Sequence, residues 1–235
     1  MISWLLNNTP FPSLESALVE PNGLLAAGGD LSIQRLLTAY RAGIFPWFNE
    51  GEPILWWSPD PRMILFPNEL KISRSLRKSL KRNLFTICFD QHFEQVMHAC
   101  AAPREGQSGT WIHPEMILAY SKLHEMGLAH SAEVLVDDVL VGGLYGVALG
   151  KVFFGESMFS NVTDASKIAF VHLVKKLDEW NYGVIDCQVK TAHLASLGAR
   201  EIPRVEFSRL LNVLISDIDK GEKWECSDSL NEKLY

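Results

Sequence analysis

Three polar residues stand in segments that are otherwise apolar enough to form buried strands. Glu156 lies within Val-Phe-Phe-Gly-Glu-Ser-Met-Phe, and Asp186 and Gln188 lie two apart within residues 184–189. Side chains two apart leave the same face of a strand, roughly 7 Å from each other along it. Burying a polar group, and above all a carboxylate, is costly unless the group is paired or used in the reaction. All three residues are therefore candidate catalytic groups. A purely structural polar network is the alternative that the pattern alone leaves open.

The sequence around these residues predicts the elements that position them. Two turns, Asp137-Asp138 and Gly150-Lys151, separate apolar runs and therefore predict hairpins. A capping residue, Asp164 or Thr163, precedes a helical pattern. The expected elements are strands over residues 133–136, 140–149 and 152–160, a helix over 165–181 and a strand over 183–189. Glycines inside the predicted strands, at Gly142, Gly143, Gly146 and Gly155, indicate either close neighbours or β-bulges.

The flanking sequence adds further elements. Helices are expected over residues 32–42, 93–101, 114–126, 191–197 and 206–219, and a strand over 84–89. The tail from Lys220 is charged and is expected to be frayed.

Composition limits the class of protein. At 235 residues, the chain fits one large domain or two small ones. Its hydrophobic content of 47% and charged content of 21% are typical of a soluble globular protein. No apolar run approaches the roughly 18 residues of a membrane span, and the N-terminus does not resemble a signal peptide. The four cysteines are scattered and the seven histidines show no ligand spacing, so we expect reduced thiols and no metal.

A basic segment contrasts with the net charge of −6, which by itself argues against general nucleic-acid binding. Residues 71–82 hold six of the 22 Lys and Arg residues and no acid. Ser73 can cap a short helix that docks through Leu76 and Leu80 and carries its cations on another side. Because such dense like charges repel one another, a phosphate-backbone partner explains them better than a solvated helix face. The candidate contact residues are Lys71, Arg74, Arg77, Lys78, Lys81 and Arg82.

Large aromatic residues crowd a proline-rich stretch that contains Trp47, Phe48, Trp56 and Trp57. Trp56 and Trp57 are expected in the core beneath this loop. Trp47 is a better candidate for an exposed surface on which a base could stack, an interaction worth about 1–3 kcal/mol per base. Trp111, on the loop before the helix expected at residue 114, is a second candidate, with core packing as the alternative.

Longer motifs are more specific than any of these patterns. They include Glu20-Pro-Asn-Gly-Leu-Leu-Ala, Gly28-Gly-Asp-Leu, Gly43-Ile-Phe-Pro-Trp-Phe, Trp56-Trp-Ser-Pro-Asp-Pro-Arg, Gly109-Thr-Trp-Ile, Gly155-Glu-Ser-Met-Phe-Ser, Ala165-Ser-Lys and Ile185-Asp-Cys-Gln-Val. In this order they closely resemble the bacterial leucyl/phenylalanyl-tRNA–protein transferases. The resemblance runs from about residue 11 to residue 207.

The resemblance implies an α+β fold with a small N-terminal domain, residues 1–62, and a GNAT-like acyltransferase domain, residues 63–235. The larger domain would hold a mixed, mostly antiparallel sheet flanked by helices. The implied activity is the transfer of Leu, Phe and, less readily, Met from aminoacyl-tRNA to proteins that begin with Arg or Lys, which marks them for N-degron degradation. No cofactor is implied, and we expect a cytoplasmic monomer.

The resemblance also implies roles for particular residues. Trp47 and Trp111 match aromatic residues near the terminal adenosine of the tRNA, and Phe153 matches a wall of the aminoacyl pocket. Further pocket candidates are Leu144, Phe170, Leu173, Leu177 and Ile185. The basic segment would hold the acceptor stem.

Glu156, Asp186 and Gln188 match the polar catalytic and acceptor-binding residues of the family. We hypothesise that Glu156 reads the cationic side chain of the acceptor, while Asp186 holds the amine and helps to take its proton. An amide is barely basic, so Gln188 is expected to orient the reactants or to stabilise the oxyanion.

Two alternatives stay open. One is a coenzyme-A-dependent N-acetyltransferase of the same fold, although residues 161–166 lack the glycine-rich pyrophosphate loop that such enzymes carry before the corresponding helix. The other is a non-catalytic RNA-binding module, which the basic segment and exposed aromatic residues permit but the buried polar residues do not explain.

Overall fold

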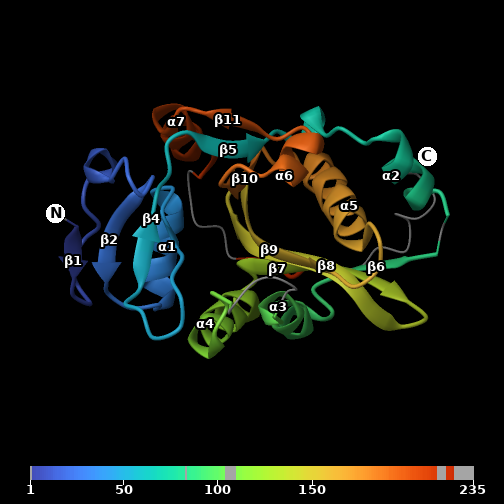
Figure 1. The fold of residues 1–235 in the computed structure, drawn as a ribbon, viewed down its shortest axis with the longest axis horizontal. Coiled ribbons are helices and arrows are strands. Elements are labelled where there is room, and N and C mark those ends of the chain that lie inside the picture. Colours follow the sequence, from blue (N-terminus) through green and yellow to red (C-terminus); the bar gives the residue numbers. More distant parts are fainter. Residues whose placement is uncertain (1, 83, 104–109, 216–220, 225–235) are drawn as a thin grey trace.

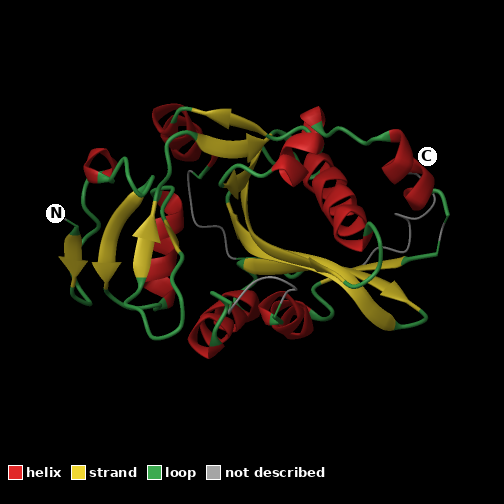
Figure 2. Cartoon of the chain, viewed as in Figure 1, coloured by secondary structure: helices red, strands yellow, loops and turns green. Residues whose placement is uncertain are grey.

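The computed structural model describes residues 2–82, 84–103, 110–215 and 221–224, which form two sheets and the helices that cover them (Figures 1 and 2). The smaller sheet uses strands from the first 57 residues, and the larger sheet uses strands from residue 62 onwards. The predicted α+β class is confirmed. The division into two domains at residue 62 stays a prediction, and Arg62 itself begins the first strand of the larger sheet.

The four-stranded sheet has the order β1-β2-β4-β3 and packs against helix α1 (Figure 1). Its strands are β1 (Ser3–Leu5), β2 (Leu24–Gly28), β3 (Phe45–Pro46) and β4 (Leu55–Trp57). Helix α1 (Ile33–Arg41) begins after Ser32, whose side chain accepts a hydrogen bond from the backbone N of Arg35. A serine in this position stabilises the helix start. Leu36 and Tyr40 on the inner face of α1 are 0% exposed.

The seven-stranded sheet has the order β11-β5-β10-β9-β8-β7-β6. Its strands are β5 (Arg62–Leu65), β6 (Thr86–Phe89), β7 (Ala129–Val136), β8 (Val139–Leu149), β9 (Val152–Ser160), β10 (Val184–Gln188) and β11 (Arg200–Ile202). β9 and β10 run parallel, and the other neighbouring strands run antiparallel. The sheet is therefore mixed and mostly antiparallel, as predicted.

Helices cover both faces of the larger sheet (Figure 1). α5 (Ala165–Glu179) lies on one face, and α3 (Phe93–Ala101) and α4 (Pro114–Glu125) lie on the other. The remaining helical segments are η1 (Leu14–Ser16), η2 (Pro67–Glu69), α2 (Arg74–Leu80), α6 (Ala192–Ser196) and α7 (Arg204–Leu214). Within the part of the chain that the structure describes, no helix has both the length and the apolar character of a membrane span.

The central unit from β7 to β10 has the predicted order of elements. Its turn at Asp137-Asp138 has the positive φ angles, 47° and 61°, that a tight hairpin turn requires. β7 begins four residues earlier than predicted, at Ala129, because residues before Glu133 pair with β8 as well. Segments of few residues, such as β3 and β11, were missed because they carry no periodic pattern.

The predicted side-chain cap at the start of α5 is not formed. Asp164 precedes the helix, but its backbone is left-handed, with φ of 65°, and its side chain makes no capping bond. Its carboxylate instead accepts hydrogen bonds from Ser79 Oγ at 2.8 Å and from Lys167 Nζ at 3.1 Å. Asp164 therefore ties the start of α5 to the basic helix α2.

The tail is also better anchored than predicted. α7 ends at Leu214 rather than near residue 219, and residues 216–219 lie outside the described part of the chain. Trp224 is only 7% exposed and belongs to the core on the α5 side of the sheet. The prediction of a frayed tail therefore fails at Trp224.

Glu133 on β7 should make the protein less stable as the pH rises. Its side chain is 0% exposed, and burial raises the pKa of its carboxyl group from 4.5 to about 7. The folded state therefore keeps a proton that the unfolded state releases, so stability should fall between pH 4.5 and about pH 7. Glu133→Gln should raise the free energy of unfolding by about 1–3 kcal/mol at pH 8 and change it little at pH 5.

Urea titrations at these two pH values measure this effect. Glu115→Gln is the matched control, because Glu115 is exposed on α4. Equal changes at both pH values in Glu133→Gln would show that the Glu133 carboxyl group does not titrate in this window.

Candidate functional site

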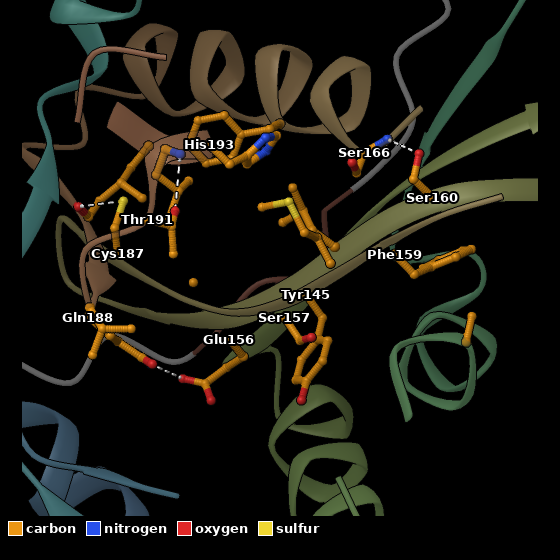
Figure 3. A pocket seen from close by; sticks show the side chains of 18 of the residues that line it. Tyr145, Glu156, Ser157, Phe159, Ser160, Ser166, Cys187, Gln188, Thr191 and His193 are labelled. Carbon is orange, nitrogen blue, oxygen red and sulfur yellow. Dashed lines mark hydrogen bonds between the residues drawn. The ribbon is translucent and has the colours of Figure 1, made fainter. Parts of the chain in front are cut away.

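A cavity of about 770 Å³ is lined by residues of β8, β9, β10 and α5 and by neighbouring loops (Figure 3). Many of the predicted site residues line it. They are Trp111, Leu144, Phe153, Glu156, Phe170, Ile185, Asp186 and Gln188. Residues from five separate segments of the sequence thus meet at one site.

Glu156 occupies a β-bulge. Tyr145 on β8 pairs with Ser157 on β9, while Gly146 pairs with Gly155, so Glu156 has no partner on β8. A bulge of this kind redirects a side chain from the regular alternation of its strand. Figure 3 shows the Glu156 side chain pointing toward Gln188. Gly146 and Gly155 therefore flank a bulge, whereas Gly142 and Gly143 have close neighbours, because an added Cβ would lie 2.5 Å from Ala165 Cβ and 2.9 Å from Ala132 O respectively.

Three side chains donate hydrogen bonds to the Glu156 carboxylate. Oε1 accepts from Tyr40 Oη at 2.8 Å and from Gln188 Nε2 at 3.0 Å, and Oε2 accepts from Tyr120 Oη at 3.2 Å. The hydroxyl groups of Tyr40 and Tyr120 also lie within hydrogen-bonding distance of each other, and because each has one proton, all of these contacts form at once only when Glu156 is protonated. Burial raises the pKa of Glu156 to about 7, aided by the nearby charge of Asp186 and opposed by these hydrogen bonds. Glu156 is therefore poised to change its charge near neutral pH.

The two tyrosines were not predicted as site residues. Tyr40 lies on α1 and Tyr120 in the interior of α4, within segments that were predicted only as helices. Both are 0% exposed. A buried tyrosine hydroxyl normally has a hydrogen-bond partner, so their position on inner helix faces was the available signal. Tyr40 brings the N-terminal part of the chain into the site.

Asp186 forms a buried ion pair with Arg62. Its side chain is 0% exposed, and it is held by Arg62 through Nε–Oδ1 and Nη2–Oδ2 hydrogen bonds of 2.8 and 2.7 Å. The Arg62 guanidinium lies between aromatic neighbours, 4.8 Å from the ring centroid of Phe45 and 4.9 Å from that of Phe207. Arg62 donates one hydrogen bond to each carboxylate oxygen of Asp186, and direct contact of Asp186 with the acceptor amine stays a prediction. No local pattern indicates this pairing, because the two residues are 124 positions apart.

Gln188 is oriented by this ion pair. Its backbone N donates to Asp186 Oδ1 at 2.9 Å, and the pairing between β10 and β5 shifts register between these two residues. Gln188 has a φ of 60°, a left-handed backbone that a side chain other than glycine adopts at some cost. Arg62 and Asp186 thus fix the backbone from which Gln188 reaches Glu156. The Asp186 side chain thus binds Arg62, while the Gln188 side chain binds Glu156.

An apolar wall completes the cavity. It contains the predicted residues Leu144, Phe153, Phe170 and Ile185 together with Met158, which was not predicted. Leu173 and Leu177, also predicted for the pocket, are both buried in the core and do not line this cavity. They follow Phe170 along α5, but the cavity reaches only the first turns of that helix.

Polar residues beyond the predicted three also border the cavity. Thr191 and His193, labelled in Figure 3, are two of them. Thr191 Oγ1 caps α6 by accepting from Leu194 N at 3.1 Å. His193 Nε2 is buried and has no hydrogen-bond partner among the described residues. No group of three or more His, Cys, Asp or Glu side chains among the residues described could hold a metal ion.

The tryptophans considered as candidate stacking surfaces differ in exposure and in position. Trp47 is 45% exposed, as predicted, and its ring packs against Trp57 with a centroid distance of 5.6 Å. Trp56 is 0% exposed, as predicted, whereas Trp57 is only partly buried. Trp111 lines the cavity and Trp47 does not, so the structure does not bring these two rings into one pocket.

The basic helix has the predicted form. Ser73 Oγ accepts from Leu76 N at 3.2 Å at the start of α2, and Leu76 and Leu80 are 2% and 6% exposed. The predicted contact residues Lys71, Arg74, Arg77, Lys78, Lys81 and Arg82 are all exposed. α2 therefore docks through leucine and presents its cations to solvent.

The fold and the site define an α+β enzyme with an apolar substrate cavity that ends at a hydrogen-bonded carboxylate. Comparison with known proteins gives the family. The family model of the leucyl/phenylalanyl-tRNA protein transferases matches residues 64–212, and the model of the N-terminal domain of the same proteins matches residues 29–60.

The transferase of Nitrosomonas eutropha is 66% identical over 224 residues, which are 95% of this chain and 96% of that protein. The transferase of Nitrosospira multiformis is 65% identical, over 97% of this chain and 98% of that protein. Both are called leucyl/phenylalanyl-tRNA–protein transferase. The chain belongs to this family, and the predicted resemblance is confirmed.

Solved structures match more weakly. L-PGS from Bacillus licheniformis has a TM-score of 0.39 and 11% identity, over 71% of this chain and 53% of that chain. A GCN5-related N-acetyltransferase from Kribbella flavida has a TM-score of 0.33 and 11% identity, over 70% of this chain and 59% of that chain. Scores this low support no argument, so the GNAT-like architecture stays a prediction.

Proposed function

We propose that the protein transfers Leu, Phe and, less readily, Met from aminoacyl-tRNA to the α-amine of proteins that begin with Arg or Lys. Family membership supports aminoacyl transfer from tRNA to a protein N-terminus and favours it over both alternatives. The observation that carries the finer proposal is the apolar cavity that ends at Glu156, because it pairs a site for an apolar side chain with a site for a cation. Such transfer would mark the acceptor for degradation in the cytoplasm, and we propose that the enzyme acts as a monomer.

The donor side chain would occupy the apolar wall formed by Leu144, Phe153, Met158, Phe170 and Ile185. Each methylene in such a pocket is worth only about 1–3 kcal/mol of discrimination. A moderate preference among Leu, Phe and Met follows. Trp111 borders the cavity and would support the terminal adenosine, while Trp47 would offer a separate exposed ring to the RNA.

The reaction needs an amine, an activated ester and charge stabilisation. The neutral α-amine attacks the ester carbonyl, the C–N bond forms, and the bond to the ribose oxygen breaks as one proton passes from the amine to that oxygen. An α-amine has a pKa near 7.7–8.0, so part of it is neutral at cellular pH. Positioning and oxyanion stabilisation are therefore the main tasks of the protein.

The polar residues divide these tasks. Glu156 would bind the cationic side chain of the acceptor, which a carboxylate attracts strongly in a partly desolvated site. Gln188 would orient the reactants beside it, since its Nε2 donates to Glu156 and its carbonyl oxygen can accept from an amine. Asp186, bound by Arg62, would act as a positioning residue for Gln188.

The charge of Glu156 should make transfer depend on pH. Its pKa of about 7 means that the carboxylate form grows as pH rises through neutrality. The ratio of wild-type to Glu156→Gln initial rates on an Arg-initiated peptide should rise about tenfold between about pH 6 and about pH 8. Taking the ratio removes the titration of the acceptor amine, which both proteins share. A ratio that stays constant over this range would contradict the assigned charge.

The cations of α2 should contribute binding energy to every tRNA alike. Neutralising Arg74, Arg77 and Lys78 together with glutamine should weaken Leu-tRNA and Phe-tRNA equally, because phosphate contacts carry no sequence information. The slope of log affinity against log salt should become shallower by about 2–3 units if each cation contacts one phosphate. Filter binding over a range of salt concentrations measures both effects.

A second triple variant controls for the loss of charge alone. Arg41, Lys122 and Arg209 are exposed and lie outside α2, so replacing them with glutamine should leave the salt slope unchanged. Weakened binding of only one of the two tRNAs in the α2 variant would contradict the phosphate-contact assignment.

A transfer assay tests the function itself. The purified protein would be mixed with Phe-tRNA and an Arg-initiated peptide, with a Gly-initiated peptide as control, and analysed by mass spectrometry. We expect added Phe on the Arg peptide alone. Transfer to both peptides would contradict the acceptor specificity, and transfer to neither would contradict the proposed function.

A further inference from the structure

Trp224 is held to the larger sheet by a hydrogen bond from its backbone. Its N donates to Asp90 Oδ2 at 2.8 Å. Asp90 also accepts from Ser131 N at 3.0 Å and lies 2.8 Å from His130 Nδ1, and its side chain is only 2% exposed. One buried carboxylate thus joins the end of β6, the start of β7 and the segment of residues 221–224. Such a charge-assisted network fixes the position of the segment.

The Trp224 ring lies in an aromatic cluster. It stacks on His130, with ring centroids 3.9 Å apart and planes 2° apart, and meets the Trp180 ring edge-on at 5.1 Å. Phe89 lies 6.2 Å away and Phe153 lies 5.9 Å away between ring centroids. Aromatic pairs at such distances add stabilisation beyond the area that they bury. Trp224 therefore connects the tail to Phe153 directly.

Phe153 forms part of the cavity wall and has little freedom of its own. It is 1% exposed, and a Cβ added at Gly146 would come within 2.5 Å of its ring. Close packing transmits the shape of one side chain to its neighbours. The ring position of Phe153 thus depends on Gly146 within the sheet and on Trp224 from the tail.

We propose that Trp224 is a positioning residue that sets the size of the donor cavity through Phe153. This inference rests on the proposed function, in which the Phe153 wall contacts the donor side chain. Without the indole, a void would open behind Phe153, and the surrounding structure would fill it only partly. The Phe153 ring would then shift away from the cavity and into this void. The cavity would become larger and would favour a large donor side chain over a smaller one.

The test compares donors rather than total activity. Transfer to one Arg-initiated peptide would be measured with Phe-tRNA and with Leu-tRNA, and the ratio of the two kcat/KM values would be calculated. In Trp224→Ala this ratio should shift toward Phe by about fivefold, within the range that a change of pocket size produces. Trp224→Phe, which keeps an aromatic ring, should restore most of the wild-type ratio. If Trp224→Ala does not fold, Trp224→Leu takes its place, and the same shift of the ratio toward Phe is expected.

Leu25→Ala is the matched control for lost stability. Leu25 on β2 is 2% exposed, belongs to the other core cluster and does not line the cavity, so its loss should leave the donor ratio unchanged. A Trp224→Ala or Trp224→Leu ratio within about twofold of wild type, in a protein that transfers both amino acids, would overturn this inference alone. A wild-type protein that transfers neither would instead overturn the proposed function.

Discussion

Arg62→Met is expected to lower the free energy of unfolding by about 3–5 kcal/mol, the largest loss of stability that a single substitution at this site should cause. Arg62 and Asp186 are 1% and 0% exposed and share two hydrogen bonds. Removing the guanidinium would leave the Asp186 carboxylate buried without its partner. Chemical denaturation measures the loss.

An exposed ion pair supplies the control. Arg200 and Glu69 are 49% and 44% exposed, so Arg200→Met should cost less than about 1 kcal/mol. The double variant Arg62→Met with Asp186→Leu removes both charges and should recover much of the stability lost in Arg62→Met. If Arg62→Met lowered the free energy of unfolding no more than Arg200→Met does, the buried Arg62–Asp186 pair would not have the predicted importance for stability.

Glu156→Gln is expected to lower kcat/KM for an Arg-initiated peptide by about 100-fold, since truncating or neutralising one partner of a desolvated charge pair typically costs 2–5 kcal/mol. Glutamine keeps the shape of the side chain but removes the charge that would bind the acceptor cation. Steady-state transfer of Phe from Phe-tRNA measures the effect.

Glu133→Gln is the matched control for this substitution. Glu133 is also buried and its pKa is also about 7, but it hydrogen-bonds to Ser131 and does not line the cavity. The control should keep near-normal transfer. Near-normal transfer by Glu156→Gln would exclude Glu156 from acceptor binding.

Local pattern was sufficient for the central part of the fold. The hairpins from β7 to β9, the helix α5 and the strand β10 follow from apolar runs and turn residues within a few positions of one another. The same local argument placed Ser73 at the start of α2 and its leucines against the protein. Polar residues within apolar segments, together with the family motifs, indicated Glu156, Asp186 and Gln188, all of which line the cavity.

Partners distant in sequence could not be predicted in this way. Tyr40 and Glu156 are 116 positions apart and meet where α1 lies beside the larger sheet. Arg62 and Asp186 are 124 positions apart and meet because β5 and β10 pair within that sheet. The left-handed backbone at Gln188 and the bulge at Glu156 are further departures from regular strands, and both redirect a site residue. Trp224 was missed because one aromatic residue in a charged tail has no periodic neighbours to reveal its burial.

The most direct test of the central claim uses two acceptor peptides that differ only in charge. One begins with Arg and the other with citrulline, which has nearly the same shape but is neutral, and both are assayed with wild type and Glu156→Gln. If Glu156 reads the acceptor cation, wild type should prefer the Arg peptide by about 100-fold in kcat/KM, and Glu156→Gln should use both peptides about equally. A Glu156→Gln enzyme that keeps the wild-type preference would contradict the claim and assign recognition of the cation to another group.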